Sequence, residues 1–283
     1  MHPTRRWFIT GASSGIGRQL VERALDRGDQ VVATVRRADA LAELQARAGD
    51  ALSVELLDLR DLPAIEDVVR RVSARGPVDV VVNNAGYSVI GALEELTADQ
   101  IDDQLRTLLH GPIALTKAFL PALRDNGGGH IIQISSIGGQ ISYPGSSVYH
   151  AAKWGLEGFT ESVATEVAPF GIRFTIVEPG ATRTGFARAL QFTPELPPYA
   201  TGPVADLRAY LRTADDQAFP GDPAAIAAVL ADLPSASEPP LRLAMGEDSV
   251  DALASAFESR AQSLRDNEEL SRSVRYSPAP RSG

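Results

Sequence analysis

The chain has 283 residues, of which 44% are hydrophobic, and its formal net charge at pH 7 is −9. This length and apolar content predict one large α/β domain with a sizeable core. The negative charge argues against nucleic acid as a partner, because proteins that follow a phosphate backbone concentrate positive charge. The absence of cysteine excludes disulfides and thiolate metal sites.

The first residues and the hydropathy of the chain bear on its location. The start, "MHPTRRWFITGAS", runs directly into a predicted strand, which leaves no room for the apolar segment of a signal peptide. No stretch reaches the near-continuous apolar length of a membrane span. We therefore expect a cytoplasmic protein with no membrane partner.

Short apolar runs rich in β-branched residues alternate with longer stretches of helical period. This alternation predicts a Rossmann-like, doubly wound α/β fold, with a seven-stranded parallel sheet and helices on both faces. The predicted strands are Trp7–Thr10, Gln30–Val35, Ala51–Leu56, Val78–Val82, His130–Ser135, Arg173–Glu178 and Leu241–Ala244. The predicted helices are Ile16–Arg27, Ala38–Ala48, Leu62–Ala74, Gln100–Leu123 and Val148–Ala168. A ligand is expected at the carboxyl ends of the strands.

The regular alternation stops after residue 184. The segment from about 185 to 222 mixes aromatic residues with Pro and Gly, a pattern typical of either a lid or a disordered linker. Its aromatic content favours a lid that covers the binding site and argues against a disordered linker. Residues 247–272 predict a terminal helix, and residues 273–283 predict a flexible tail. The whole chain, 1–283, is expected to form one domain.

A glycine-rich turn, "TGASSGIG", joins the first predicted strand to the first helix over Thr10–Gly17. Glycines let such a turn fold tightly and let backbone N–H groups approach a pyrophosphate at the helix N-terminus, where the helix dipole favours negative charge. An ordinary tight turn is the alternative interpretation of this stretch by itself. Its place between strand and helix favours dinucleotide binding.

Tyr149 and Lys153 form the second motif, in "VYHAAKWG". On a helix the two side chains share one face and lie within reach of each other. A neighbouring ammonium favours the phenolate and lowers the pKa of the phenol from its usual value near 10, so that the phenol can exchange a proton with a carbonyl oxygen. The chain has only two lysines, Lys117 and Lys153, among 27 basic residues, and the alternative is a chance pair on a helix face.

Further motifs follow the third to sixth strands in order: "LDLRD", "NNAG", the pair Ser135–Ser136, "YHAAK" and "EPG". With the glycine turn they resemble the short-chain dehydrogenase/reductase family from about residue 5 to 186. The pattern is similar to single-domain, NADP-preferring members and, loosely, to the branch that oxidises steroids and retinoids. The resemblance implies that Tyr149 is the acid/base, that Lys153 lowers its pKa and binds the nicotinamide ribose, and that Ser136 holds the substrate oxygen. Ser135 is the competing choice for Ser136.

The resemblance also implies a dinucleotide site. Asp58 would meet the adenine, the loop after strand four would line the adenine ribose and brace that strand, and the loop after strand six would carry the nicotinamide. Val35 stands where NAD-preferring members have Asp, and Arg36 follows it, which favours NADP(H) because arginine matches a phosphate. Alternatively, Arg36 and Arg37 are a solvated charge pair. The implied cofactor-binding residues are Gly11, Ser13, Ser14, Gly15, Ile16, Gly17, Arg36, Asp58, Leu59, Asn83, Asn84, Ala85, Gly86, Tyr149, Lys153, Pro179, Gly180, Thr182 and Thr184.

One family residue is missing from the chain. Leu108 occupies the position of an Asn whose main-chain carbonyl holds a relay water in the family, so we expect slower or altered proton supply to Lys153. His110 could substitute for it, but a histidine on the helix surface is the favoured interpretation. Four scattered histidines and no cysteine predict no metal site.

These features predict an NADPH-dependent reductase of a fairly apolar ketone or aldehyde, or the reverse alcohol dehydrogenase. The lid aromatics and two tyrosines beside motif loops suggest the apolar pocket: Phe186, Phe192, Tyr199, Tyr210, Tyr87 and Tyr143. The alternatives are an NADP-binding sensor without turnover and an epimerase or dehydratase of the same family. The resemblance further implies a homodimer or homotetramer, built through the helices at roughly 100–123 and 150–168.

Overall fold

The computed structural model describes residues 4–186 and 189–276. Its main sheet is parallel throughout, and its strand order is β3-β2-β1-β4-β6-β7-β9. The strands are β1 (Arg6–Ile9), β2 (Gln30–Val35), β3 (Leu52–Leu56), β4 (Val80–Asn83), β6 (Gly129–Ile134), β7 (Ile172–Pro179) and β9 (Arg242–Met245). The predicted doubly wound sheet is thus confirmed, with the bounds of β2 as predicted and the ends of the other strands displaced by at most two residues.

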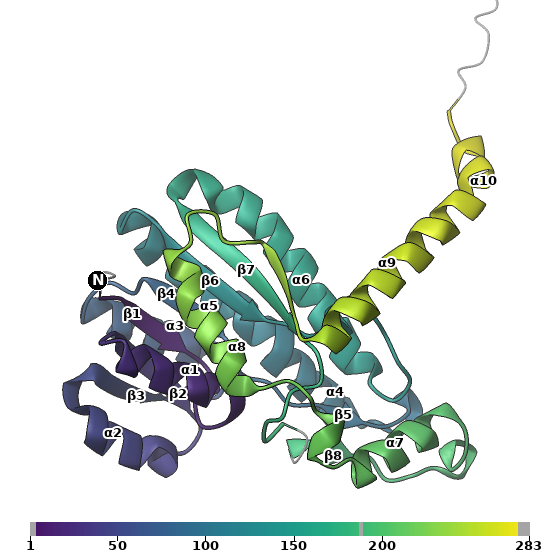
Figure 1. Ribbon diagram of the computed structural model, residues 1–283, viewed down its shortest axis with the longest axis horizontal. Coiled ribbons are helices and arrows are strands. Elements are labelled where there is room, and N and C mark those ends of the chain that lie inside the picture. The colour runs from purple at the N-terminus through teal and green to yellow at the C-terminus, as the bar shows by residue number, and fades with distance from the viewer. Residues whose placement is uncertain (1–3, 187–188, 277–283) are drawn as a thin grey trace, which may run out of the picture.

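Helices cover both faces of this sheet (Figure 1). Successive strand residues enter opposite cores: Trp7 and Ile9 pack with α1, α2 and α8, whereas Phe8 packs with α3, α5 and α6. Burying each such side chain contributes about 1.5–3 kcal/mol, so both faces of β1 hold the sheet between the helix layers. The helices are α1 (Gly15–Asp26), α2 (Ala42–Ala48), α3 (Leu62–Ala74), α4 (Ala98–Leu105), α5 (Gly111–Asp125), α6 (Ser147–Val167), α7 (Pro203–Thr213), α8 (Pro223–Asp232), α9 (Glu247–Asp266) and α10 (Glu268–Ser273).

One predicted helix is broken by a π turn, one helix of the core was not predicted, and the terminal helix expected over residues 247–272 is two helices, α9 and α10. The helix expected over Gln100–Leu123 is two helices, α4 and α5, joined by a π-helical turn over Arg106–His110. Gly111 closes this wider turn by donating its N–H to the carbonyl of Arg106, and a π turn of this kind often lies at a functional site. The helix α8 was not predicted; its Ile226 and Leu230 are buried in the core against α1.

The segment proposed as a lid is folded in its described part. A short strand, β8 (Gln191–Phe192), pairs in parallel with β5 (Val89–Ile90), which follows β4. The Thr193 hydroxyl donates to a carboxylate oxygen of Glu95 at 3.0 Å. The segment then continues into α7, so it is attached to the loop that leaves the β4 end of the sheet.

The terminal helix α9 leaves the body of the molecule, and α10 continues outward (Figure 1). The first part of α9 packs on the body through the buried Ser249 and Leu253, and the Arg260 guanidinium further along the helix lies over the Trp154 ring of α6 at 4.7 Å. The last part of the predicted tail, residues 277–283, lies outside the described residues. None of the helices in the described part of the chain is long and apolar enough to span a membrane.

Candidate active site

The motif residues gather at the carboxyl edge of the sheet, because parallel strands end there together. The glycine turn follows β1, Asn84 follows β4, Ser136 follows β6, and Gly180 follows β7. Segments far apart in sequence therefore meet at one edge, as the sequence predicts.

The glycine turn is held against the loop after β4. The Asn84 amide donates to the carbonyl of Thr10 at 2.9 Å, and the Thr10 hydroxyl accepts from the Asn84 and Ala85 N–H groups at 2.9 and 3.1 Å. Gly11 has φ +65°, and a Cβ there would lie 2.6 Å from Cα of Ala85. A Cβ at Gly17 would overlap the Asn84 amide. Asn84 thus holds the turn in shape, while Ser13 and Ser14 are exposed before α1.

The side chain of Asn83 points into the protein. Asn83 is buried, and its amide donates to the Thr116 hydroxyl on α5 at 3.3 Å. The neighbouring strand supplies a second donor to the same hydroxyl, the Gln133 amide at 3.3 Å. Asn83 therefore braces β4 against α5, as expected, with its side chain turned away from the surface. Leu59 is also buried, and Gly111 of α5 packs against it.

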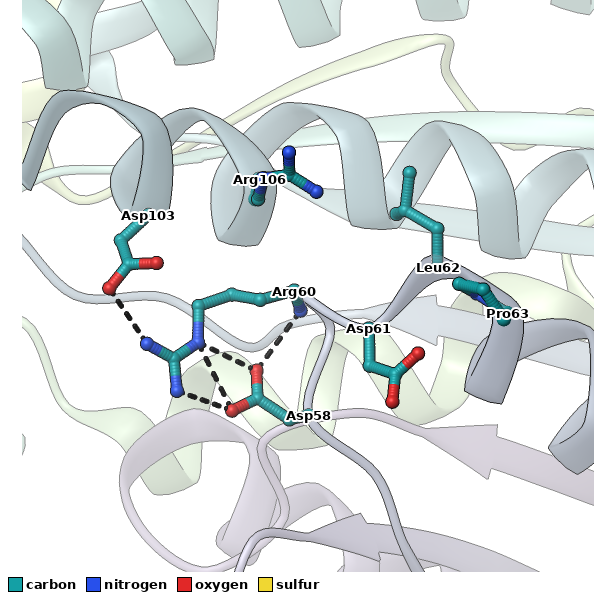
Figure 2. Close-up of a pocket in the computed structure, with 7 residues that line it drawn as sticks. All are labelled: Asp58, Arg60, Asp61, Leu62, Pro63, Asp103 and Arg106. Atoms are coloured by element: carbon teal, nitrogen blue, oxygen red, sulfur yellow. Dashed lines mark hydrogen bonds and ion pairs between the residues drawn. The ribbon is translucent and has the colours of Figure 1, made fainter. Parts of the chain in front are cut away.

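A pocket of about 670 Å³ opens beside Asp58, at the expected adenine end (Figure 2). Arg60 crosses it: its guanidinium donates to Asp58 at 2.7 Å and to Asp103 at 2.7 Å. Hydrogen bonds from Arg60 lower the pKa of Asp58 although burial raises it, and the charge of Arg36 acts in the same lowering direction. Asp58 and Arg36 therefore lie within electrostatic range of each other. The lining residues are Asp58, Arg60, Asp61, Leu62, Pro63, Asp103 and Arg106, none of which belongs to the Ser136, Tyr149 and Lys153 set.

Tyr149 lies at the centre of the expected catalytic group. It is 7% exposed and packs with Leu108 of the π turn and with Ala152. Its ring centroid is 6.3 Å from that of Phe186, at the start of the lid. The Ser136 side chain hydrogen-bonds Tyr149 and also accepts the Gly138 N–H at 3.0 Å. Ser136 and Tyr149 are therefore brought together as predicted, and Leu108 packs beside them.

Burial controls the acidity of Tyr149 in this structure. Burial is the largest effect and raises the pKa of Tyr149 well above its usual value, whereas the hydrogen bond from Ser136 lowers it. The family resemblance implies instead that Lys153 lowers the pKa of Tyr149. The Lys153 ammonium is 5.8 Å from the centroid of the Tyr149 ring and donates to the Ile134 carbonyl at 2.7 Å. The nearby group that lowers the pKa of the phenol is thus Ser136.

Lys153 is itself almost fully buried, at 5% exposed. Burial lowers the pKa of its ammonium to about 8, and the charge of Glu157 opposes that effect. An ammonium poised near neutral pH is typical of residues that act in proton transfer.

His150, beside Tyr149, holds the loop that carries Ser136. Its Nε2 accepts the Tyr143 N–H at 3.1 Å, so its Nδ1 carries the proton and donates to the Gly138 carbonyl at 2.8 Å. Burial lowers the pKa of His150, which keeps the ring neutral. The ring centroids of Tyr149 and His150 are 6.0 Å apart. His150 is a structural support of the site.

Asp248, on α9, supports the loop after β7. It accepts the Ala181 N–H at 2.7 Å, and a Cβ at Gly180 would overlap its carboxylate. The loop continues through Thr182, which bridges to Gly221, and Thr184, whose side chain would lie 3.1 Å from a Cβ at Gly15. Thr184 thus meets the glycine turn, and Pro179, Gly180 and Thr182 precede it in the chain at the end of β7 and in the loop that follows.

Sequence reasoning missed Arg60, His150, Glu157 and Asp248 as members of the site. The position of Glu157, four residues after Lys153 on the same helix, was a usable signal. The contact of Asp248 with Ala181 spans 67 residues, and no local pattern indicates it.

The aromatic residues expected at the substrate pocket are dispersed. Tyr143 stacks edge-on against His150, with 4.3 Å between ring centroids, near the site. Phe192 packs under the Arg212 guanidinium at 5.1 Å, and the Tyr199 hydroxyl donates to Glu94 at 2.9 Å. Tyr210 is 54% exposed. Of the lid aromatics, Phe186 is the one recorded in ring contact with Tyr149 among the described residues.

Two other predicted positions are resolved. Tyr87 hydrogen-bonds Thr107 and lies within range of the charges of Asp103, Arg60 and Arg36, near the pocket of Asp58 but not among its lining residues. His110 is exposed on the helix surface, which agrees with the favoured interpretation. In the described part of the chain, no group of three or more acidic or histidine side chains is arranged to hold a metal ion.

Comparison with known proteins shows similarity over nearly the whole chain. Residues 5–194 match the family model for short chain dehydrogenase. The chain is 37% identical over 257 residues to an oxidoreductase, BOA17, of Botryotinia fuckeliana, covering 90% of this chain and 93% of that protein. The crystal structure of a short-chain dehydrogenase from Streptomyces avermitilis has a TM-score of 0.90 at 42% identity, covering 98% of this chain and 100% of that one. The structure of an alcohol dehydrogenase from the archaeon Thermococcus sibiricus, complexed with 5-hydroxy-NADP, has a TM-score of 0.69 at 25% identity, covering 86% and 96% of the two chains.

Proposed function

The chain belongs to the short-chain dehydrogenase family and is an oxidoreductase, and on that premise we propose that it reduces a fairly apolar ketone or aldehyde with NADPH, or catalyses the reverse oxidation. The observation that carries the proposal is the arrangement of three side chains, Ser136 after β6 and Tyr149 and Lys153 near the start of α6. There the Ser136 hydroxyl hydrogen-bonds Tyr149, and the Lys153 ammonium lies 5.8 Å from the Tyr149 ring.

The glycine turn is suited to the pyrophosphate of a dinucleotide cofactor. Gly11 and Gly15 adopt the left-handed conformation, with φ +65° and +57°, and the turn ends at the N-terminus of α1, where no side chain caps the helix. Backbone N–H groups in this arrangement favour a phosphate. The glycine turn would hold the pyrophosphate, and the loop of Pro179–Thr184 would lie at the nicotinamide. When bound, the nicotinamide supplies or accepts a hydride at the carbon of the substrate.

The residues of the chain complete the chemistry. Ser136 donates a hydrogen bond to the substrate oxygen and stabilises the charge that develops there. Tyr149 donates its phenolic proton to that oxygen as the carbonyl becomes an alcohol, and takes it back in the oxidation. The raised pKa of Tyr149 keeps the phenol protonated at neutral pH, which suits donation in the direction of reduction. Lys153 holds positive charge beside the phenol.

The preference for NADP(H) is supported by the end of β2. Val35 is 4% exposed and offers no carboxylate to a ribose 2′-hydroxyl, and Arg36 is exposed beside the pocket of Asp58. A guanidinium there matches the 2′-phosphate of NADP(H). The related alcohol dehydrogenase of Thermococcus sibiricus, solved with 5-hydroxy-NADP, is consistent with this choice.

The test is the loss of NADPH absorbance with a panel of apolar ketones and aldehydes. We expect turnover by the wild type and a fall in kcat of about 10²–10⁴-fold in Tyr149→Phe. Tyr143→Phe is the matched control, since it removes a neighbouring phenol that stacks on His150. Tight NADPH binding without turnover on any substrate would instead support the alternative of a sensor.

We further propose that copies of the chain associate through the outer faces of α4, α5 and α6. Trp154 on α6 is 43% exposed although the Arg260 guanidinium of α9 lies over its ring at 4.7 Å, and the exposed part of the ring supplies apolar surface for such a contact. Sedimentation of the protein tests the proposal; a purely monomeric species at micromolar concentration would contradict it.

A further inference from the structure

Glu157 lies one helical turn beyond Lys153 on α6. Glu157 is 1% exposed and Lys153 is 5% exposed, and a spacing of four residues places them on the same face of the helix. The Lys153 ammonium donates to the Ile134 carbonyl at 2.7 Å, and Glu157 accepts a hydrogen bond from the Ser135 hydroxyl at 2.5 Å. The two side chains therefore hold neighbouring residues at the end of β6, immediately before Ser136.

Glu157 also holds the far end of the turn that carries Ser136. The Gln140 amide donates to the second carboxylate oxygen of Glu157. A Cβ at Gly139 would overlap the Glu157 carboxylate, so glycine is required there for the carboxylate to enter the turn. The turn of Ser135–Gln140 is thus wrapped around one buried acid.

The surroundings of Glu157 are strongly charged. Arg242 on β9 donates to Glu157 at 2.6 Å, to Glu178 on β7 at 2.5 Å and to Glu161 on α6 at 2.8 Å. Burial raises the pKa of Glu178 to about 7, and the charge of Glu157 raises it as well. The charged or titratable groups around Glu157 are Tyr149, Lys153 and Glu161 on α6, Glu178 on β7, Arg242 on β9 and, through Gln140, Arg260 on α9.

We propose that Glu157 is a positioning residue of the active site, which holds the turn of Ser136 in place and supplies the buried negative charge that keeps Lys153 an ammonium. The inference rests on the proposed function of Lys153 and Ser136. In this proposal the Glu157 carboxylate controls both the position of Ser136, which donates to the substrate oxygen, and the protonation of Lys153.

The electrostatic part follows from the burial of Lys153. Burial lowers the pKa of Lys153 to about 8, and Glu157 is the group whose charge raises it. Because an opposite charge favours the protonated amine, loss of the Glu157 charge lets Lys153 lose its proton at a lower pH. Lys153 would then be neutral over part of the range in which the enzyme works.

The experiment uses the scarcity of lysine in the chain. With only Lys117 and Lys153 present, protein labelled with ¹³C at lysine Cε gives two signals, and Lys117→Arg assigns them. In Glu157→Gln we expect the titration midpoint of Lys153 to move to lower pH by about 1 pH unit or more. A midpoint unchanged from the wild type overturns the electrostatic part of the proposal.

Glu161→Gln is the matched control. It removes another carboxylate partner of Arg242 from the same helix, but Glu161 is 50% exposed and has no recorded contact with Ser135 or Gln140. We expect its Lys153 midpoint to stay at the wild-type pH. An equal displacement in both variants would mean that Arg242, and not Glu157, controls Lys153.

Glu157→Asp tests the positioning part and keeps the proposal falsifiable if Glu157→Gln does not fold. The shorter side chain keeps the charge but withdraws from Ser135. We expect kcat for NADPH-dependent reduction to fall about tenfold with little change in the KM for NADPH, while Glu161→Asp retains full kcat. Full activity in Glu157→Asp overturns the positioning role. An inactive wild type would refute the proposed function. The lysine titration needs no turnover, so it would still decide whether the charge of Glu157 controls Lys153.

Discussion

Arg208 on α7 and Glu95 in the loop after β5 form an ion pair in which 2.5 Å separates Nη2 from Oε2, and their side chains are only 2% and 0% exposed. Glu95 also accepts the N–H groups of Ala92 at 2.8 Å and Leu196 at 2.9 Å. One carboxylate thus fastens the segment proposed as a lid to the loop that leaves β4. This segment is held by buried charge as well as by strand pairing.

This pair predicts a large loss of stability when one partner is removed. Arg208→Met leaves the Glu95 carboxylate buried without its counter-ion, and we expect the free energy of unfolding to fall by about 3–5 kcal/mol in a denaturant titration. Arg212→Met is the control, because its pair with Glu195 is 51% and 40% exposed and contributes about 1 kcal/mol or less. Similar losses in both variants would show that burial of the first pair is unimportant.

The cofactor preference predicts a selective effect of Arg36. In Arg36→Ala we expect the KM for NADPH to rise by about tenfold or more relative to the KM for NADH, because a charge-assisted contact to a phosphate is lost. Arg37→Ala is the neighbouring control; that side chain pairs with Asp39 at 3.3 Å. Equal changes with the two cofactors would refute the assignment to Arg36.

His130 predicts a loss of stability in acid. It is 1% exposed, its Nε2 hydrogen-bonds the Thr175 hydroxyl at 3.0 Å, and burial lowers its pKa to about 3. Below about pH 6.5 the unfolded chain binds a proton that the folded chain excludes. The contribution of His130 is therefore complete above that pH and is lost progressively as the pH falls toward 3.

The measurement is the free energy of unfolding at pH 7 and pH 5. From pH 7 to 5 the wild type should lose about 2 kcal/mol more than His130→Gln, whereas exposed His110→Gln should behave as the wild type. The pKa of Glu178 is raised to about 7, so its effect has the opposite sign, and the stability that it contributes decreases as the pH rises toward 7. The wild type and both variants contain Glu178, so this effect cancels in the comparison. An identical pH dependence in His130→Gln would contradict the assignment.

Leu108 predicts a change in proton supply. It is 1% exposed and packs with Tyr149 and Ala152, so Leu108→Asn should cost about 1–3 kcal/mol through burial of an amide among apolar groups. If the leucine slows proton supply to Lys153, kcat should rise in the variant at temperatures where it stays folded. Leu109→Asn, at the half-buried neighbour, is the control, and an unchanged rate and pH profile would show that position 108 does not limit the reaction.

The structure agrees with the sequence most closely where the signal is local. The strand Gln30–Val35 was predicted with the bounds it has, because its apolar run is buried on both faces of the sheet. The helix α8 was missed because "PAAIAAVLAD" is apolar on nearly all sides and has no amphipathic period. The break between α4 and α5 was missed because the apolar pattern continues through the π turn.

The sequence by itself determined the seven strands of the main sheet, their parallel direction, the loops that carry Gly11, Ser136 and Gly180 and the helix that carries Tyr149, because hydrophobic period, glycine and helical spacing are local properties of the chain. Only the tertiary structure decided which groups set the pKa values, hydrogen bonds and ion pairs of the site residues. Burial raises the pKa of Tyr149, the Ile134 carbonyl accepts from Lys153, and Arg60 pairs with Asp58. Solvent exclusion and contacts between distant segments exist only once the helices have packed on the sheet, so no local pattern could specify them.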